Sequence, residues 1–283
     1  MTKFKLDSII VNGTACSNTN SNSIFESYVE SRKKLDKLPK AYKKDEQSVL
    51  LSLFKESHYQ KTNNAFFRKH DSANDALISY WISKVKNLAH LYISMNDIPE
   101  FSGITKQEIM DIARNTSDVS YIKNIESTLA SKGIILVIEP SISGLKTDGA
   151  IFKATSGHPV IAMSLRYKRL DNFWFTLMHE LAHLHLHYDD LDGYIVDDFD
   201  VKSTDIIELE ANKLAGDALI PRHLWRTCHA RKDLKPESVE SFATKNNVHP
   251  AIVAGRIRRE KDDFSLFSKI VNKVKVQEVL FDE

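Results

Sequence analysis

The sequence predicts an α+β fold, in which a small β-sheet and an apolar helix form a central unit between helical segments. Helical patterns fill much of the chain before residue 131, and the tail from about residue 236 onward is helical again. β-Branched runs gather between residues 133 and 165, and an apolar helical pattern follows at once. This order of elements is typical of an α+β domain inside a mostly helical protein.

The composition is that of a folded protein with a sizeable core. Of the 283 residues, 42% are hydrophobic and 27% are charged, which excludes wholesale disorder. The net charge of +1 gives no global attraction to nucleic acid or to anionic membranes. No signal-peptide run is visible, and the apolar stretches are far shorter than the ~20 residues that span a bilayer. We therefore expect a cytoplasmic protein without a membrane partner.

Residues 1–130 form the first predicted region, which is mainly helical. Its first 60 residues have no well-defined pattern, and two shorter helical patterns lie near 105–115 and 118–131. Its clearest element is a long helix with one apolar face, made of Ile78, Trp81, Ile82, Val85, Leu88, Ala89 and Tyr92.

The sheet is predicted to begin after Gly133, where the run GIILVIEP predicts a buried strand that ends before Pro140. Residues 149–155 and 159–165 are two further strands. They flank Ser156-Gly157-His158, and this arrangement predicts a β-hairpin with a glycine-containing turn.

The next helix is predicted to begin at a cap formed by Asp171 or Asn172 and to stay apolar through Leu184. Residues 189–205 are polar and predict a loop. A further helix ends near Leu219, where Ile220-Pro221 stops it. We expect residues 131–230 to form the central domain and residues 231–283 to form a helical C-terminal segment.

The segment His179-Glu180-Leu181-Ala182-His183 is an HExxH pattern within this apolar helix. Residues four apart lie one turn apart on the same helix face, so both imidazoles can reach one metal ion. Glu180 projects beside that ion and can take a proton from its bound water. The alternative interpretation is a solvent-exposed helix that is rich in histidine and binds no metal, but this helix is too apolar to be exposed to solvent.

A catalytic zinc needs a third protein ligand, and several residues are candidates. His187 lies ~12 Å along the helix axis from His179, too far to share its ion, so His185 and His187 are expected to be structural or to support the ligands. Asp189 could bind only if the helix broke and turned back.

The remaining candidate, Glu208, lies on the next helix and shares a face with Asn212, which could orient a ligand. Glu210 points about 200° away from Glu208 around that helix. The alternative interpretation of Glu208 is a capping box with Asp205.

The segments RLDNFWFTLMHELAHLHLH and ELEANKLAGDALIP resemble the ImmA/IrrE metallopeptidases. The resemblance covers residues 65–260 and is most specific over 160–221. The hairpin segment and AFFRKHDSANDALISYWISKV also resemble larger proteins in which such a domain follows a HigA-type antitoxin region. Those relatives usually begin with a helix-turn-helix, which residues 1–60 do not display, so a built-in promoter-binding role is not expected.

The resemblance implies a zincin-like domain of the gluzincin type, with His179, His183 and Glu208 as zinc ligands and Glu180 as catalytic base. It implies a zinc-dependent endopeptidase with a narrow protein substrate, such as a DNA-binding repressor or an antitoxin. A substrate strand could add to a sheet edge near residues 149–155. Spacing leaves the donor for the oxyanion open among Arg166, Tyr167, Tyr194 and His223.

Residues 238–260 could form a helix-turn-helix with a basic second helix that carries Arg256, Arg258 and Arg259. We favour an ordinary helical hairpin with solvated arginines, because charge clusters usually face water. The alternative function is a non-hydrolytic, antitoxin-like transcriptional regulator that keeps a structural or sensing metal site and binds DNA or a partner protein through this element.

The two cysteines cannot form a disulfide framework or a Cys₄ zinc site. Cys16 could act as a removable zinc ligand, but a lone cysteine in a polar loop is usually incidental. Cys228 lies near His223 and His229, yet the arginines around it argue against a second cation site.

Overall fold

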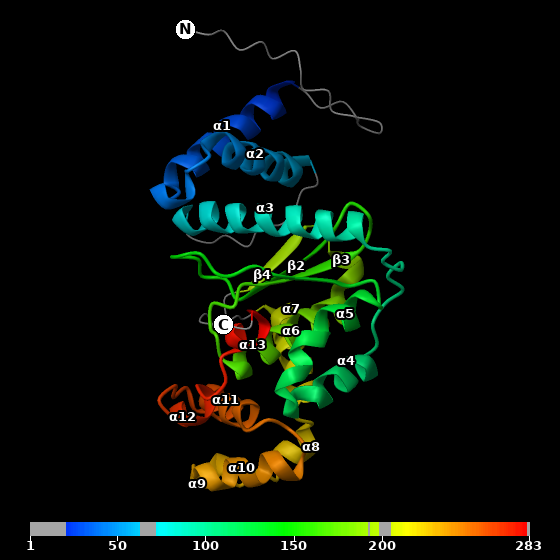
Figure 1. Cartoon of the computed structure of the whole chain (residues 1–283), viewed down its shortest axis with the longest axis vertical. Helices are drawn as coiled ribbons and strands as arrows, with labels where there is room; N and C mark the ends of the chain where they lie inside the picture. Colours follow the sequence, from blue (N-terminus) through cyan, green and yellow to red (C-terminus); the bar gives the residue numbers. More distant parts are fainter. Residues whose placement is uncertain (1–20, 63–71, 192, 198–204, 282–283) are drawn as a thin grey trace.

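The computed structural model describes residues 21–62, 72–191, 193–197 and 205–281 (Figure 1). Its centre is a four-stranded sheet with the strand order β1-β3-β2-β4. Strand β1 runs parallel to β3, and β2 is antiparallel to both β3 and β4. This sheet and the helices around it confirm the mixed α+β class. The strands are β1 (Ile135–Ile138), β2 (Gly149–Lys153), β3 (Pro159–Met163) and β4 (Tyr194–Asp197).

Strands β2 and β3 form the predicted hairpin. The Ala154 N–H donates to the His158 carbonyl at 2.8 Å, and the Gly157 N–H donates to the Ala154 carbonyl at 2.9 Å. Gly157 has a φ of +87°, a left-handed conformation that glycine adopts without steric cost. The glycine therefore allows the tight turn that brings these strands together.

The predicted loop 189–205 is partly wrong, because it contains β4. This strand pairs with β2, with Ile195 opposite Ile151. Since β3 occupies the other side of β2, the backbone of residues 149–152 is paired on both sides. The expectation of an exposed sheet edge near residues 149–155 is therefore wrong, and the outer strands of the described sheet are β1 and β4.

Helix α3 covers one face of the sheet, and the two preceding helices pack on α3 (Figure 1). Long helix α3 lies against β1, and its Trp81 is fully buried and donates its indole N–H to the Glu139 carbonyl at 3.0 Å. The prediction that Leu88 belongs to the apolar face of α3 is wrong, because Leu88 is 41% exposed and lies at the margin of the buried face. These helices are α1 (Ser21–Lys37), α2 (Glu46–Thr62) and α3 (Ser72–Met95).

The opposite face of the sheet packs on α4 (Lys106–Ala113), α5 (Ile125–Ala130), α6 (Leu170–His187) and α7 (Ile206–Leu219). The strand residues alternate between the two faces, as β-strand geometry requires. Ala150 and Phe152 belong to the hydrophobic cluster with α3, whereas Ile151 belongs to the cluster with α6.

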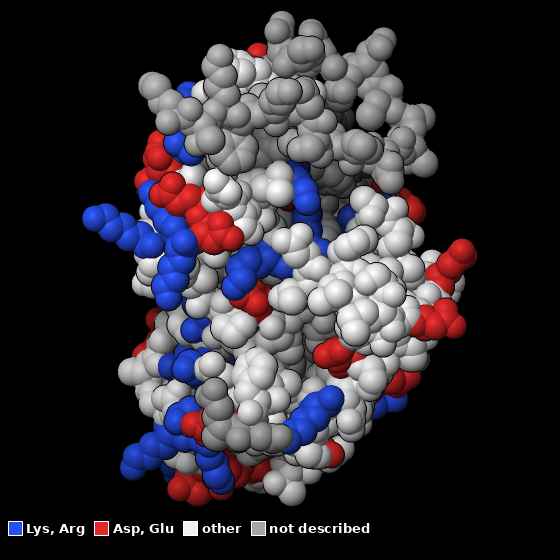
Figure 2. All heavy atoms as spheres, turned by 45° about the horizontal axis from the view of Figure 1, so that its top comes forward, with Lys and Arg blue, Asp and Glu red and all other residues white. Residues whose placement is uncertain are grey.

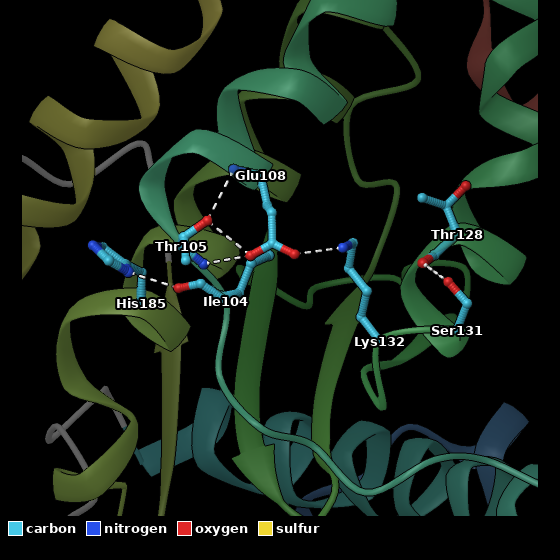
Figure 3. Close-up of polar contacts among 7 residues, drawn as sticks. All are labelled: Ile104, Thr105, Glu108, Thr128, Ser131, Lys132 and His185. Atoms are coloured by element: carbon cyan, nitrogen blue, oxygen red, sulfur yellow. Dashed lines mark hydrogen bonds and ion pairs between the residues drawn. The ribbon is translucent and has the colours of Figure 1, made fainter.

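The start of α4 is fixed by a capping box between Thr105 and Glu108 (Figure 3). Lys132 adds an ion pair to Glu108 at 2.6 Å. His185 of α6 contacts the preceding Ile104 carbonyl through Nδ1 at 2.7 Å. This histidine therefore ties α6 to the segment before α4, which agrees with the structural role expected for it.

Helix α6 begins at Leu170, so the cap predicted at Asp171 or Asn172 is wrong. Arg169 directly precedes the helix, and its backbone forms an isolated antiparallel β-bridge with Lys275. Next to it, the Lys168 carbonyl accepts a hydrogen bond from the Val276 N–H at 2.8 Å. The C-terminal segment thus fixes the start of α6 through backbone contacts that are far away in sequence.

The segment after α7 consists of short helices, and two of them, α10 and α11, form the predicted helix pair. Helix α11 packs on α6 and buries Ile252, Val253 and Ile257 in the core. In the described part of the chain, no helix is both long and apolar enough to cross a membrane. The helices are α8 (Arg222–Trp225), α9 (Ala230–Asp233), α10 (Pro236–Lys245), α11 (Pro250–Lys261), α12 (Ser268–Val271) and α13 (Val276–Phe281).

Two of the three arginines of α11 are not simply solvated, which corrects that expectation for Arg256 and Arg258, while Arg259 is exposed as expected. Arg256 donates to the Gly216 and Ile220 carbonyls at 2.8 and 2.7 Å, where α7 ends. Arg258 is only 5% exposed. Positive charge at a helix C-terminus is stabilising, so Arg256 ties α11 to the end of α7, whereas Arg258 donates to the Phe264 carbonyl.

Candidate metal centre

Three buried side chains converge where α6 packs on α7. His179 and His183 come from the middle of α6, and Glu208 comes from the first turn of α7. The ligand atoms of the three residues all lie within 4.8 Å of one another. The structure thus brings together the three residues that the sequence predicts as metal ligands.

The two imidazoles face the same point, with 2.8 Å between their Nε2 atoms. The Glu208 carboxylate lies 3.3 Å from each of these nitrogens, with Oε2 near His179 and Oε1 near His183. Two ring nitrogens this close are compatible only with a shared proton or a shared cation. A carboxylate beside them favours the cation, and two imidazoles with one carboxylate are the protein ligands of several catalytic zinc sites.

Burial raises the pKa of the Glu208 carboxyl, but hydrogen bonds from His179 and His183 outweigh it, and the pKa of Glu208 lies well below its usual range. Glu208 is therefore charged in the folded protein. A buried negative charge is stabilised by positive or hydrogen-bonding partners, and the two imidazoles supply the hydrogen bonds here.

The structure distinguishes the interpretation of Glu208 as a metal ligand from its interpretation as a helix cap, and from other candidate ligands. Asp205 caps α7 by accepting the Ile207 N–H at 3.0 Å, while the Glu208 carboxylate faces the histidines. Asp189 and Glu210 are both exposed, and neither joins the cluster found among the described residues. His187 is buried, with its ring 5.6 Å from that of His183, and it also lies outside the cluster.

Glu180 is fully buried and lies under strand β2. A Cβ atom at Gly149 would overlap the Glu180 Oε1 atom and would crowd Thr176 Cγ2 at 2.9 Å. Only glycine at position 149 leaves room for this carboxylate. The residues around the HExxH pattern do not point to Gly149, although glycine inside a strand is a known signal of close approach by another group.

A cleft of about 1050 Å³ lies along the two helices that carry the triad, although the three triad residues do not themselves line it. It runs between α6, α7, α8 and α11, and its lining includes Phe175, one turn before His179, and Asn212, one turn after Glu208. Asn212 is thus placed on the side of α7 that faces the cleft. The role predicted for it, which is to orient a ligand, stays a prediction.

The predicted oxyanion donors differ in where they lie. Arg166 is close to the buried Asp148, with 3.7 Å between Nη1 and Oδ2, and Tyr167 lines the cleft. His223 is exposed on α8. The backbone of Tyr194 lies in β4, and its side chain is outside the described part of the structure.

The cysteines add no further cluster to the described structure. Cys228 is buried, and burial raises the pKa of its thiol, so it stays protonated. Cys16 lies outside the described residues. Among the described residues, His179, His183 and Glu208 form the group that could hold a metal ion.

Residues 131–258 match a protein-family model, peptidase family M78, described as an IrrE N-terminal-like domain. A search among curated proteins finds no match. The matched range contains the HExxH helix, Gly149 and Glu208, and this supports the resemblance to ImmA/IrrE proteins, whereas the likeness to HigA-type fusions stays a prediction. The segment that carries the His-His-Glu cluster is therefore similar to a family of metallopeptidases.

Proposed function

We propose that this protein is a zinc-dependent endopeptidase of the gluzincin type with a zincin-like central domain. The observation that supports it most directly is the convergence of His179, His183 and Glu208 on one buried point, beside a second buried carboxylate, Glu180. The match of the surrounding segment to a peptidase family supports the same conclusion.

The donor set fits a catalytic zinc ion. His179, His183 and Glu208 would hold it, which leaves a coordination position for water or substrate. A zinc ion bound there would supply Lewis acidity and lower the pKa of its water toward ~7. Asn212 would orient a ligand from the next turn of α7.

Glu180 acts as the general base in this proposal. Its carboxylate accepts a proton from the attacking water and then donates that proton to the leaving amine nitrogen. Gly149 gives the carboxylate its space, and the buried surroundings keep bulk water away. Such a pair of roles for one carboxylate requires a fixed position, which the close contact with β2 supplies.

We further propose that the substrate is a protein partner of the cytoplasm, such as a DNA-binding repressor or an antitoxin. The ImmA/IrrE resemblance suggests this class. Basic and acidic side chains are intermixed on the face shown in Figure 2, which fits the near-zero net charge and gives no broad basic surface on that face.

Metal analysis of purified variants tests the ligand set. Wild type is expected to hold about one zinc per chain, and Glu208→Ala is expected to lose it, because a carboxylate ligand is removed. Glu210→Ala is the matched control, since Glu210 is exposed on the same helix. Equal zinc in wild type and Glu208→Ala would remove Glu208 from the site.

Cleavage of a peptide library, followed by mass spectrometry, tests the catalytic role. Glu180→Gln should keep its zinc and lose cleavage by at least ~100-fold, as expected when a general base is removed. Cleavage at the wild-type rate by Glu180→Gln would contradict the proposed function.

The alternative, a regulator that binds DNA through residues 238–260, has less support. Arg256 is engaged with the end of α7 and Arg258 is buried, so these residues contribute little to a recognition surface. Salt-dependent binding of duplex DNA by the full chain, without any hydrolysis, would favour the regulator instead.

A further inference from the structure

The cleft beside the His-His-Glu triad has a basic lining, and we infer that it binds an acidic stretch of the substrate chain. This inference rests on the proposed peptidase function and adds a substrate class to it. Seven Lys and Arg side chains line the cleft against four Asp and Glu side chains, a surplus of three positive charges. The basic lining consists of Arg169, Lys213, Arg222, Arg226, Arg231, Arg256 and Arg259.

Part of this charge is compensated within the protein. Arg231 and Arg256 share Glu260, at 3.0 and 3.8 Å, and Arg169 pairs with Asp171 at 3.0 Å. Arg259 stacks on Phe175, with its Cζ atom 3.6 Å from the centre of the ring. These four arginines therefore belong mainly to the framework of the cleft.

Three other cations remain available at the surface of the cleft. Lys213, Arg222 and Arg226 are exposed, and no carboxylate of the described residues forms an ion pair with them. Lys213 lies in α7, Arg222 begins α8, and Arg226 directly follows the last residue of α8. An acidic ligand could therefore form ion pairs with these three cations, which carboxylates of the described residues do not neutralise.

The cleft begins at Phe175, Leu209 and Asn212, which lie within one helical turn of His179 and Glu208, and extends to these cations. Leu209 follows the predicted ligand Glu208, and Ile220 lines the other end of α7. Eleven helical residues separate them, which corresponds to ~17 Å at 1.5 Å per residue. An extended peptide rises ~3.3 Å per residue, so about five residues span this length. Acidic residues about five positions from the scissile bond would thus reach Arg222 and Arg226.

The lining favours a peptide over a nucleic acid. Phe175 and Leu209, near the triad, and Phe264 offer apolar surface to side chains. Asp217 and Asp262 also line the cleft, and their carboxylates would repel a phosphate backbone, which is charged at every unit, whereas a peptide can place uncharged residues opposite them. A peptide with alternating acidic and apolar residues satisfies both kinds of surface.

Binding to the full-length Glu180→Gln variant tests the inference without hydrolysis. The probe is a fluorescein-labelled peptide of Glu, Leu and Ala residues, and the comparison peptide has Gln in place of Glu. Fluorescence anisotropy should show binding of the Glu peptide that weakens as salt is added, and at least ~10-fold weaker binding of the Gln peptide.

Charge reversal identifies the surface. On the Glu180→Gln background, Arg222→Glu with Arg226→Glu should weaken binding of the Glu peptide at least ~10-fold, and Lys213→Glu should weaken it to a smaller extent. The matched control is Lys232→Glu with Lys235→Glu, because both lysines are exposed outside the cleft. Zinc content and circular dichroism confirm that each variant is folded.

Several outcomes would overturn the inference. These are equal binding of the Glu and Gln peptides, no effect of the reversals at Arg222 and Arg226, and tighter binding of a labelled DNA duplex that the same reversals abolish. Each of them can occur while wild type holds zinc and cleaves peptides, so the proposed function can survive the failure of this inference. Loss of zinc in wild type would instead remove the proposed function.

Discussion

Glu180 and Gly149 show how a single side chain decides whether the site can work. Glu180 is held against the Cα of Gly149, so the room for its carboxylate is set by the absence of one methyl group. We expect Gly149→Ala to push Glu180 from its position while the three predicted ligands stay in place. Zinc content should stay near wild type, and cleavage should fall at least ~100-fold, as for loss of a general base.

The control for this prediction is Gly216→Ala in the interior of α7. The nearest heavy atom to a Cβ at that position is Arg256 Cζ at 4.0 Å, an ordinary contact. Replacing a helical glycine by alanine stabilises by about 0.5–1 kcal/mol, so its Tm should not fall. Wild-type cleavage by Gly149→Ala would contradict the assigned position of Glu180.

The sequence predicts the local part of the site better than its long-range part. The spacing of His179 and His183 is a property of one helix, so pattern alone places them together. The assignment of Glu208 as a ligand depends on which helix packs against the HExxH helix. The sequence alone therefore leaves two alternatives open: Asp189 as the third ligand, and Glu208 in a capping box with Asp205. A glycine inside a strand signals a close approach at position 149, but the group that approaches it, Glu180, depends on how the strand packs on the helix, which no local pattern encodes.

At the scale of elements, the start of α4 combines a capping box with an ion pair (Figure 3). The hydrogen bond from Lys132, with those from the Thr105 backbone and hydroxyl, lowers the pKa of Glu108 from 4.5 to about 2. A lowered carboxyl pKa stabilises the fold at pH values above the unfolded pKa, and this stabilisation is lost as the pH falls toward the folded value.

Glu108→Gln should therefore lower the free energy of unfolding at pH 7 by at most about 1 kcal/mol, since the pair is partly exposed. The difference from wild type should shrink between pH 4.5 and pH 2 and disappear below that range. Urea unfolding at several pH values measures it. Glu240→Gln on the exposed face of α10 is the control, and a difference that grows toward low pH would contradict the prediction.

Strand β4 and helix α11 explain why other elements were mispredicted. Residues 189–205 are polar, and β4 forms only because β2 offers a partner more than forty residues earlier in the chain. The basic sequence of α11 is typical of a solvated or DNA-binding helix, yet Arg256 finds carbonyl acceptors at the end of α7. In both cases the decisive contact is non-local.

At the scale of the whole molecule, two hydrophobic clusters share one sheet. Residues of α1, α2 and α3 pack on one face, and residues of α4, α5, α6, α7 and α11 pack on the other. Ile112 and Leu129 lie in the same cluster as Leu177, so side-chain packing is continuous across the predicted boundary at residue 130. The family match at 131–258 therefore covers the predicted metal site but only part of the core that supports it.

Because the sheet is common to both clusters, damage to the cluster far from the metal site should destabilise that site as well. Trp81 is fully buried in the α3 cluster, and Trp81→Ala should cost about 3–5 kcal/mol, as for other large core truncations. We expect Tm to fall by roughly 6–15 °C. Helix loss, followed by circular dichroism, and zinc release, followed by a chromogenic chelator, should move together to the lower temperature.

Leu88→Ala on the same helix is the control, because Leu88 is 41% exposed and should change the free energy of unfolding by about 1 kcal/mol or less. Separate transitions in Trp81→Ala, with zinc released only at the wild-type temperature, would mean that the α3 cluster unfolds independently. A single shifted transition would mean that the helices N-terminal to the matched domain are part of what holds the His-His-Glu site together.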